Sequence, residues 1–231
     1  FDSFFDTSDT STGFHNNHDL TRRPLIPPSS VIPSMLGVGY NAPCAIWDWC
    51  TGTKPQPDIS NLPHIINGKE KEPIAIKHFY KQFPQYSGFK AGTMFSKTVP
   101  QIAATPDQVM RKEGENEWLF GLEVKVPFNV DNLWTVPKQM YIVQCQAQMI
   151  ANPALKSVIL YEWTPNAQYA WDIPRCEELQ QCILNRTASF LEKVAEKKRP
   201  PPKKHDEELQ LLFHEHSKDI VLLLQPEVML Q

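Results

Sequence analysis

The residues best suited to chemistry lie in two short segments, the turn 105–107 (TPD) and the apolar run 121–127 (GLEVKVP). If the run forms a β-strand, Glu123 and Lys125 project from one face, because residues two apart in a strand lie on the same side. Asp107 closes the earlier turn. Two carboxylates and a lysine that converge at a sheet edge can hold a divalent metal and activate a water. This is the minimum needed to hydrolyse a phosphodiester, although a Glu-x-Lys pair on a strand is more often a solvated face.

The elements that position these residues follow from the spacing of apolar side chains. Strands are predicted at residues 101–105, 118–126 and 157–164, and helices at 67–83, 137–152, 174–198 and 207–224, with a short helix inside 34–51 and a turn at 111–117. Pro73 fits the helix 67–83 only if that helix begins near it or kinks there. This order of elements predicts an α/β fold, with a mixed central sheet flanked by helices.

Composition narrows the classes of protein. The chain has 231 residues, of which 41% are hydrophobic, and its net charge of −3 means that binding to nucleic acid would need a local basic patch. No apolar run approaches the ~20 residues of a membrane-spanning helix, so no membrane association is expected. The five cysteines have no metal-ligand spacing and are expected to be reduced thiols of an intracellular protein. The sequence has no G-x-x-x-x-G-K-[ST] loop, which argues against nucleotide hydrolysis.

Four motifs occur along the chain in a fixed order. They are NGKEKEPIA at 67–75, ATPD at 104–107, LEVKVPF at 122–128 and YIVQCQAQM at 141–149. Together they resemble the G-x-x-x-E-P-x-A helix, the [ST]-P-D turn, the E-x-K-x-P strand and the Q-x-Q-x-x-M helix of the phage lambda exonuclease type, the YqaJ-like viral recombinases of the PD-(D/E)xK nuclease superfamily. The resemblance covers roughly residues 22–194. One departure is Gln108, which stands where the family usually has glycine after the Pro-Asp pair.

The resemblance implies a restriction-endonuclease-like core and a metal-dependent DNA nuclease, in most cases a 5′-to-3′ exonuclease on duplex ends in viral or phage-type recombination. It implies two Mg²⁺ or Mn²⁺ ions, held by Asp107, Glu123 and the backbone carbonyl of Val124. Lys125 would orient the attacking water and offset charge that develops on the phosphate. Further catalytic roles are implied for Glu72 and Gln144, and contacts to phosphate or DNA for Arg23, Ser30 and Thr105.

Several interpretations stay open at this point. Arg22 and Ser29 repeat the spacing of Arg23 and Ser30, and Tyr40 and two nearby tryptophans suit either base stacking or the core. The same metal site would also serve an endonuclease or an RNase. A third class is a nucleic-acid-binding module without catalytic activity.

The expected organisation is a poorly ordered polar leader at 1–20, the nuclease domain at 21–198, and a Pro/Lys linker with a helical extension at 199–231. The resemblance implies double-stranded DNA ends as the substrate. By analogy alone, a single-strand annealing protein and further copies of the chain are expected partners. It also implies an intracellular location, in the host cytoplasm or nucleus for a viral protein and in the cytoplasm for a phage or bacterial one.

Overall fold

The computed structural model describes residues 25–129, 134–202 and 206–226, so Arg23 and the expected leader 1–20 lie outside the described residues. The strands are β1 (Tyr86–Phe89), β2 (Met94–Phe95), β3 (Ala103–Ala104), β4 (Gln108–Lys112), β5 (Phe120–Lys125), β6 (Ser157–Trp163), β7 (Gln168–Pro174) and β8 (Val221–Leu224). Six of them form one sheet in the order β1-β4-β5-β6-β7-β8, in which only the β5–β6 pair is parallel. The remaining two, β2 and β3, pair with each other.

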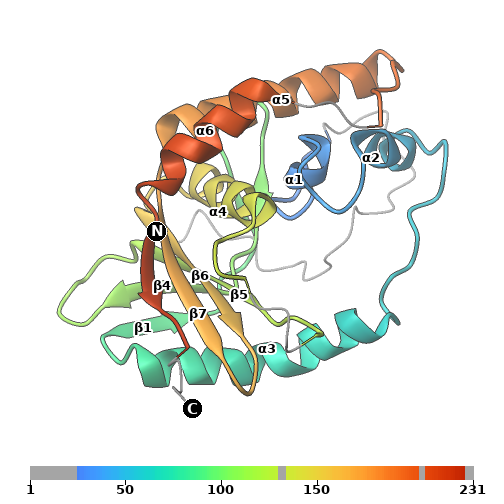
Figure 1. Cartoon of the computed structure of the whole chain (residues 1–231). Helices are drawn as coiled ribbons and strands as arrows, with labels where there is room; N and C mark the ends of the chain where they lie inside the picture. The colour runs from blue at the N-terminus through green and yellow to red at the C-terminus, as the bar shows by residue number, and fades with distance from the viewer. Residues whose placement is uncertain (1–24, 130–133, 203–205, 227–231) are drawn as a thin grey trace.

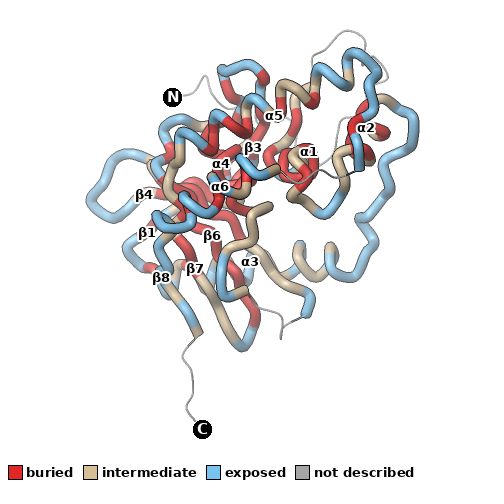
Figure 2. Tube along the Cα trace, turned by 45° about the horizontal axis from the view of Figure 1, so that its top comes forward, coloured by how far each residue is buried: buried red, intermediate tan, exposed pale blue. Residues whose placement is uncertain are grey.

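Helices cover both faces of this sheet (Figure 1). α3 (Pro63–Gln82) crosses one face, and α4 (Gln139–Ala151) packs on the other. The helices outside α4 are α1 (Ile32–Met35), α2 (Pro43–Cys50), α5 (Glu177–Ala195) and α6 (Glu207–Ser217). α4 is buried from Tyr141 to Ala151, since it lies between the sheet and α5, as the burial colours of Figure 2 show.

The alternation of β5 decides which side chains reach which layer. Leu122 and Val124 belong to the apolar cluster that contains Phe79 of α3. Glu123 and Lys125 therefore face the opposite layer, where α4 lies. The neighbouring β6 alternates in the same way and completes both apolar clusters. The strand prediction thus places the carboxylate and the amine on one face, and the predicted mixed α/β architecture is confirmed.

Some element predictions were wrong. The turn expected at 111–117 begins too early, because β4 continues to Lys112, and the predicted helix 207–224 ends at residue 217 and is followed by β8. β8 pairs with β7, and this pairing with a neighbouring strand decides its conformation. The sequence interpretation also missed β1, β2, β4 and β7. α3 begins at Pro63, with a proline in its first turn, and Pro73 lies inside the helix.

The segment after residue 198 is packed on the rest of the molecule. Arg199 makes a two-pronged ion pair with the buried Asp48 of α2, with N–O distances of 2.7 and 2.8 Å. Leu209 and Phe213 of α6 are buried in the same cluster as α4. The expected division of the chain at 20/21 and 198/199 stays a prediction. All five cysteines are free, and no helix within the described ranges is long and apolar enough to cross a membrane.

Candidate active site

The candidate site lies where β4 and β5 separate. β4 begins at Gln108, opposite Leu122, and the chain on its N-terminal side turns away through residues 105–107. Asp107 holds this fork together, because its backbone N–H donates to the Leu122 carbonyl (3.1 Å) and its Oδ2 accepts from the Val124 N–H (2.6 Å). The N–H and C=O of one strand residue point to the same side of the strand. The Val124 carbonyl therefore faces Asp107.

Glu123 and Lys125 meet two glutamines of α4. Gln144 donates to Oε1 of Glu123 (2.8 Å), and Gln148 donates to Oε2 (2.5 Å). The Lys125 Nζ donates to Glu123 Oε1 (2.5 Å) and to Gln144 Oε1 (3.2 Å), and it lies 4.7 Å from the ring centroid of Tyr141. Glu123 is 4% exposed, so burial makes this network rigid.

The charges at the site are unbalanced. Burial and then the negative charges of Glu123 and Glu72 raise the pKa of Asp107 well above its usual range, and the hydrogen bond from Val124 only partly offsets this. Burial also raises the pKa of Glu72 on α3, and Glu123 adds to the rise while Lys90 opposes it. Burial lowers the pKa of Lys125, but Glu123 outweighs it and the net shift is upward. Three carboxylates thus act on one another with too little positive charge between them.

This arrangement fits a hard divalent cation. In the part of the chain that the structure describes, no three His, Cys, Asp or Glu side chains form a cage that could hold an ion by themselves. Mg²⁺ seldom uses such cages and is usually held by one or two carboxylates, with water and substrate phosphate completing the shell. Asp107, Glu123 and the Val124 carbonyl offer such a partial set of oxygens, and a cation would offset both the burial and the carboxylate repulsion that raise the pKa of Asp107.

Two of the expected phosphate contacts, Ser30 and Thr105, lie in the described part of the chain. Residues 27–29 run parallel to β3, and the exposed Ser30 lies in the turn that follows them. Thr105 is exposed, and its hydroxyl is 3.0 Å from that of Thr93. Gln108, the departure from the family pattern, is buried and donates to the Asp107 carbonyl (2.7 Å). The larger residue therefore supports the turn.

Two residues at the site were not in the predicted set. Gln148 is four residues from Gln144, and this spacing places both on one face of α4; the spacing was visible in the sequence, although the contact with Glu123 was not. No local pattern in the sequence indicates that the Tyr141 ring lies beneath Lys125. Gln146 points away, toward the Pro174 carbonyl and His216. The aromatic ambiguity is settled for Trp47, which is buried and donates to the Lys193 carbonyl.

Two solved structures of an alkaline exonuclease share this fold. The chain superposes on the alkaline exonuclease LHK-Exo from Laribacter hongkongensis with a TM-score of 0.60 and 16% identity, over 86% of this chain and 97% of that one. LHK-Exo in complex with dAMP gives a TM-score of 0.60 and 18% identity, over 84% and 94% of the two chains. At such identity the likeness concerns the fold. No curated protein sequence matches the chain.

The chain belongs to the YqaJ-like viral recombinase domain family, whose model matches residues 20–152. The matched stretch contains α3, the fork of β4 and β5, and α4 with both of its site glutamines. The resemblance drawn from the four motifs is thereby confirmed.

Proposed function

We propose that this protein is a Mg²⁺- or Mn²⁺-dependent deoxyribonuclease that degrades duplex DNA from its ends, in the 5′-to-3′ direction. The observation that carries the proposal is the fork of β4 and β5, where Asp107 and the Val124 backbone adjoin Glu123 and Lys125. The family and the exonuclease fold support the same reaction class. The polarity and the preference for ends rest on family analogy.

In this proposal Asp107, Glu123 and the Val124 carbonyl would hold the metal, and Glu72 of α3 would help to hold a second ion. A divalent ion held there would clamp the scissile phosphate and lower the pKa of a bound water. Lys125 orients the attacking water and offsets the charge that grows on the phosphate oxygens. The water loses one proton to solvent as its oxygen forms the new bond to phosphorus, the bond to the leaving deoxyribose oxygen breaks, and that oxygen takes up a proton from solvent.

Gln144 fixes the reacting groups in this scheme. It donates to Glu123 and accepts from Lys125, so it holds the carboxylate and the amine at a constant separation. An amide is suited to this task because it carries both a donor and an acceptor and no charge. Correct placement of pre-oriented groups lowers the barrier without any motion at the moment of reaction.

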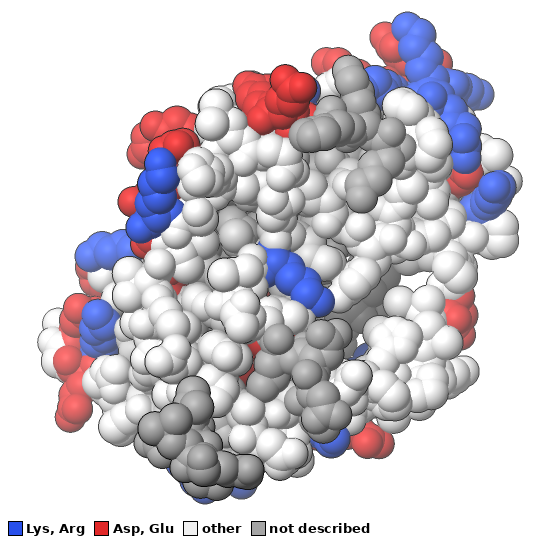
Figure 3. All heavy atoms as spheres, viewed as in Figure 1, with Lys and Arg blue, Asp and Glu red and all other residues white. Residues whose placement is uncertain are grey.

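The DNA would approach the hollow that Figure 3 shows between α3 and the helices on the other side of the sheet, where one basic side chain lies at the rim. Other charged side chains on that face gather mainly around its outline. In this proposal the exposed hydroxyls of Ser30 and Thr105 contact phosphate, and Arg23 grips a terminal 5′-phosphate.

Digestion of end-labelled linear duplexes tests the proposal. We expect release of labelled nucleotide from 5′-labelled ends in Mg²⁺, no release in EDTA, and no cleavage of closed circular DNA or of structured RNA. Glu123→Gln and Asp107→Asn preserve side-chain shape and should abolish the activity, since both remove a carboxylate charge. Gln146→Leu is the matched control on α4, because Gln146 faces away from the site.

Each alternative gives a different result. Nicking of circular DNA would identify an endonuclease, and degradation of RNA would identify an RNase. DNA binding without metal-stimulated cleavage would identify an inactive binding module and contradict the proposal. Assembly with an annealing protein or with further copies of the chain is a separate matter, which co-sedimentation and light scattering would address.

A further inference from the structure

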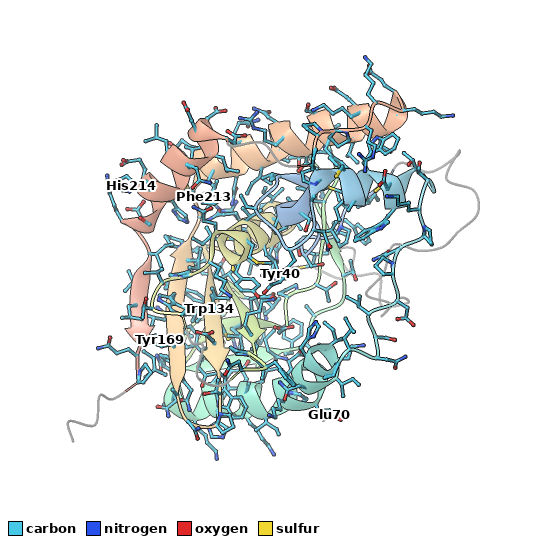
Figure 4. All side chains as sticks on the ribbon, turned by 45° about the vertical axis from the view of Figure 1, so that its right-hand side comes forward. Tyr40, Glu70, Trp134, Tyr169, Phe213 and His214 are labelled. Carbon is cyan, nitrogen blue, oxygen red and sulfur yellow. The ribbon has the colours of Figure 1, made fainter. Side chains whose placement is uncertain are left out.

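An exposed tyrosine stands beside the candidate active site. Tyr40 lies between α1 and α2 and is 75% exposed, yet its hydroxyl is 2.9 Å from the hydroxyl of Tyr141. Tyr141 is the residue whose ring lies under Lys125. One hydrogen bond and one cation–π contact therefore separate an open aromatic surface from the proposed catalytic amine. Figure 4 shows the labelled Tyr40 and Trp134 side chains between the helices on the α4 face and α3.

The loop that carries Tyr40 is fixed in place. The N–H groups of Val38 and Gly39 both donate to the Pro33 carbonyl (2.9 Å each). Gly39 packs so closely on α1 that an added Cβ would lie 2.3 Å from Ser34 Oγ. The ring of Tyr40 is thus held at its backbone and at its tip, and ordering it on binding a ligand costs little conformational entropy.

Trp134 and Lys138 extend the aromatic group that Tyr40 and Tyr141 begin. The ring of Trp134 stacks on Tyr141, with centroids 4.7 Å apart and planes at 26°. Lys138 Nζ lies 4.3 Å from the Trp134 ring centroid. Beneath them the Trp134 N–H donates to Oε2 of Glu162 (3.0 Å), which is fully buried. The aromatic group therefore reaches Lys125 through Tyr141 and carries a second cation, the N-cap residue Lys138, at Trp134.

We infer that Tyr40 and Lys138 form a subsite for one unpaired deoxynucleotide, the neighbour of the nucleotide being cleaved. The base stacks on the Tyr40 ring, and its phosphate pairs with the Lys138 ammonium, which also counters the repulsion between phosphate and the nearby carboxylates. Stacking on an aromatic ring accepts every base, so the subsite is independent of sequence. This inference rests on the proposed function, because the occupant is assigned from the phosphodiester chemistry at Lys125.

Binding of a 5′-phosphorylated single-stranded oligodeoxynucleotide with 2-aminopurine near its 5′ end tests the subsite. In EDTA and low salt no cleavage intervenes, and the unsubstituted protein should quench the fluorescence as the base stacks. Tyr40→Leu should remove the quenching and weaken binding roughly tenfold. Tyr40→Phe, which keeps the ring, should retain both. Lys138→Ala should weaken binding and reduce the slope of log K against log salt by about 0.7. Lys138→Arg, which keeps the positive charge, should retain both the affinity and the slope.

Two matched controls should leave binding unchanged. Phe89→Leu removes a 40% exposed aromatic ring from β1, and Lys112→Ala removes from β4 a lysine that lies 4.9 Å from the ring centroid of Phe120. Equal quenching by Tyr40→Leu and by the unsubstituted protein would overturn the inference. It would also be overturned if the unsubstituted protein did not bind the oligodeoxynucleotide. Preference for RNA of the same sequence would overturn the deoxynucleotide assignment. Because these readouts need no cleavage, intact binding with no nuclease activity would contradict the proposed function alone.

Discussion

Gln148 donates its side-chain amide hydrogen to Oε2 of Glu123, while Gln144 donates to the other oxygen of the same carboxylate. Both amides come from one face of α4, so the helix grips both oxygens of a buried acid. Groups that orient a metal-binding carboxylate usually matter almost as much as the carboxylate itself.

Gln148→Leu should therefore weaken metal binding by roughly 10–100-fold, because Oε2 of Glu123 loses its partner and the carboxylate is free to rotate. Calorimetric titration with Mn²⁺ measures this directly. The control is Gln146→Leu, which disturbs contacts to Pro174 and His216 and should change stability without changing metal affinity. Equal metal affinity in both variants would contradict the role of Gln148.

Asp107→Asn should raise the thermal stability of the metal-free protein and abolish stabilisation by Mg²⁺. The raised pKa of Asp107 means that its charged form is disfavoured in the folded state, so stability falls as pH rises from the ordinary carboxyl range. The amide can still accept from Val124. Saturating Mg²⁺, at about 100 times its Kd, should add about 2.7 kcal/mol to the unsubstituted protein. Thermal unfolding in EDTA and in Mg²⁺ measures both effects, and a metal-induced shift that persists in the variant would rule out Asp107 as a ligand.

Lys125→Met should reduce kcat by roughly 10²–10³-fold while metal still binds, because a charge that acts mainly on the transition state is removed. Single-turnover cleavage of a labelled duplex separates this from substrate binding. Lys112→Met is a suitable control, since Lys112 also lies over aromatic rings but sits at the far end of β4. Unchanged kcat in Lys125→Met would exclude the lysine from the chemistry.

Glu162→Gln should flatten the pH dependence of stability between about pH 4.5 and 7. Burial raises the pKa of Glu162 to about 7, although the Trp134 N–H and Lys138 oppose the shift. The folded protein thus favours the protonated acid, and stability is lost as pH rises through this window. We compare the free energy of unfolding of Glu162→Gln with that of the unsubstituted protein. From pH 4.5 to pH 8 this difference should shift in favour of the variant by up to about 3 kcal/mol. Urea unfolding at the two pH values measures this, with the exposed Glu113→Gln as control; parallel curves for Glu162→Gln and the unsubstituted protein would contradict it.

Arg199→Ala should lower the melting temperature and leave the cleavage rate of the folded protein unchanged. The substitution leaves the buried Asp48 without its two-pronged partner, although Lys54 stays 3.5 Å away. Lys198→Ala, which removes an exposed pair with Glu196, should have little effect on melting. Equal melting temperatures of the two variants would show that the ion pair does not anchor this segment.

The middle of the site was predictable because its signal is local. Period-two alternation from Leu122 to Val126 was enough to place Glu123 and Lys125 together, and i,i+4 spacing placed Gln144 and Gln148 on one helix face. The hydrogen bond from Val124 to Asp107 joins residues that are distant in the sequence and depends on where β4 begins. No local pattern encodes that contact.

The missed strands have physical reasons of their own. β4 ends in Arg111 and Lys112, which look like a charged turn but lie over the rings of Trp118 and Phe120. β8 was assigned to a helix because an apolar run without alternation does not separate the two states. In both cases the deciding partner is another strand or an aromatic ring elsewhere in the chain.

The packing of α6 against the apolar cluster that contains α4 also affects the stage of synthesis at which the site is complete. Leu209 and Phe213 complete that cluster. α4, which grips Glu123, leaves the ribosome well before α6 does, and contacts between such distant segments slow folding. A nascent chain would therefore carry every proposed catalytic residue while the layer that fixes them is unfinished. Nucleolytic activity should appear only after residues 206–224 have been synthesised and docked, a delay that would limit damage to nucleic acid near the site of translation.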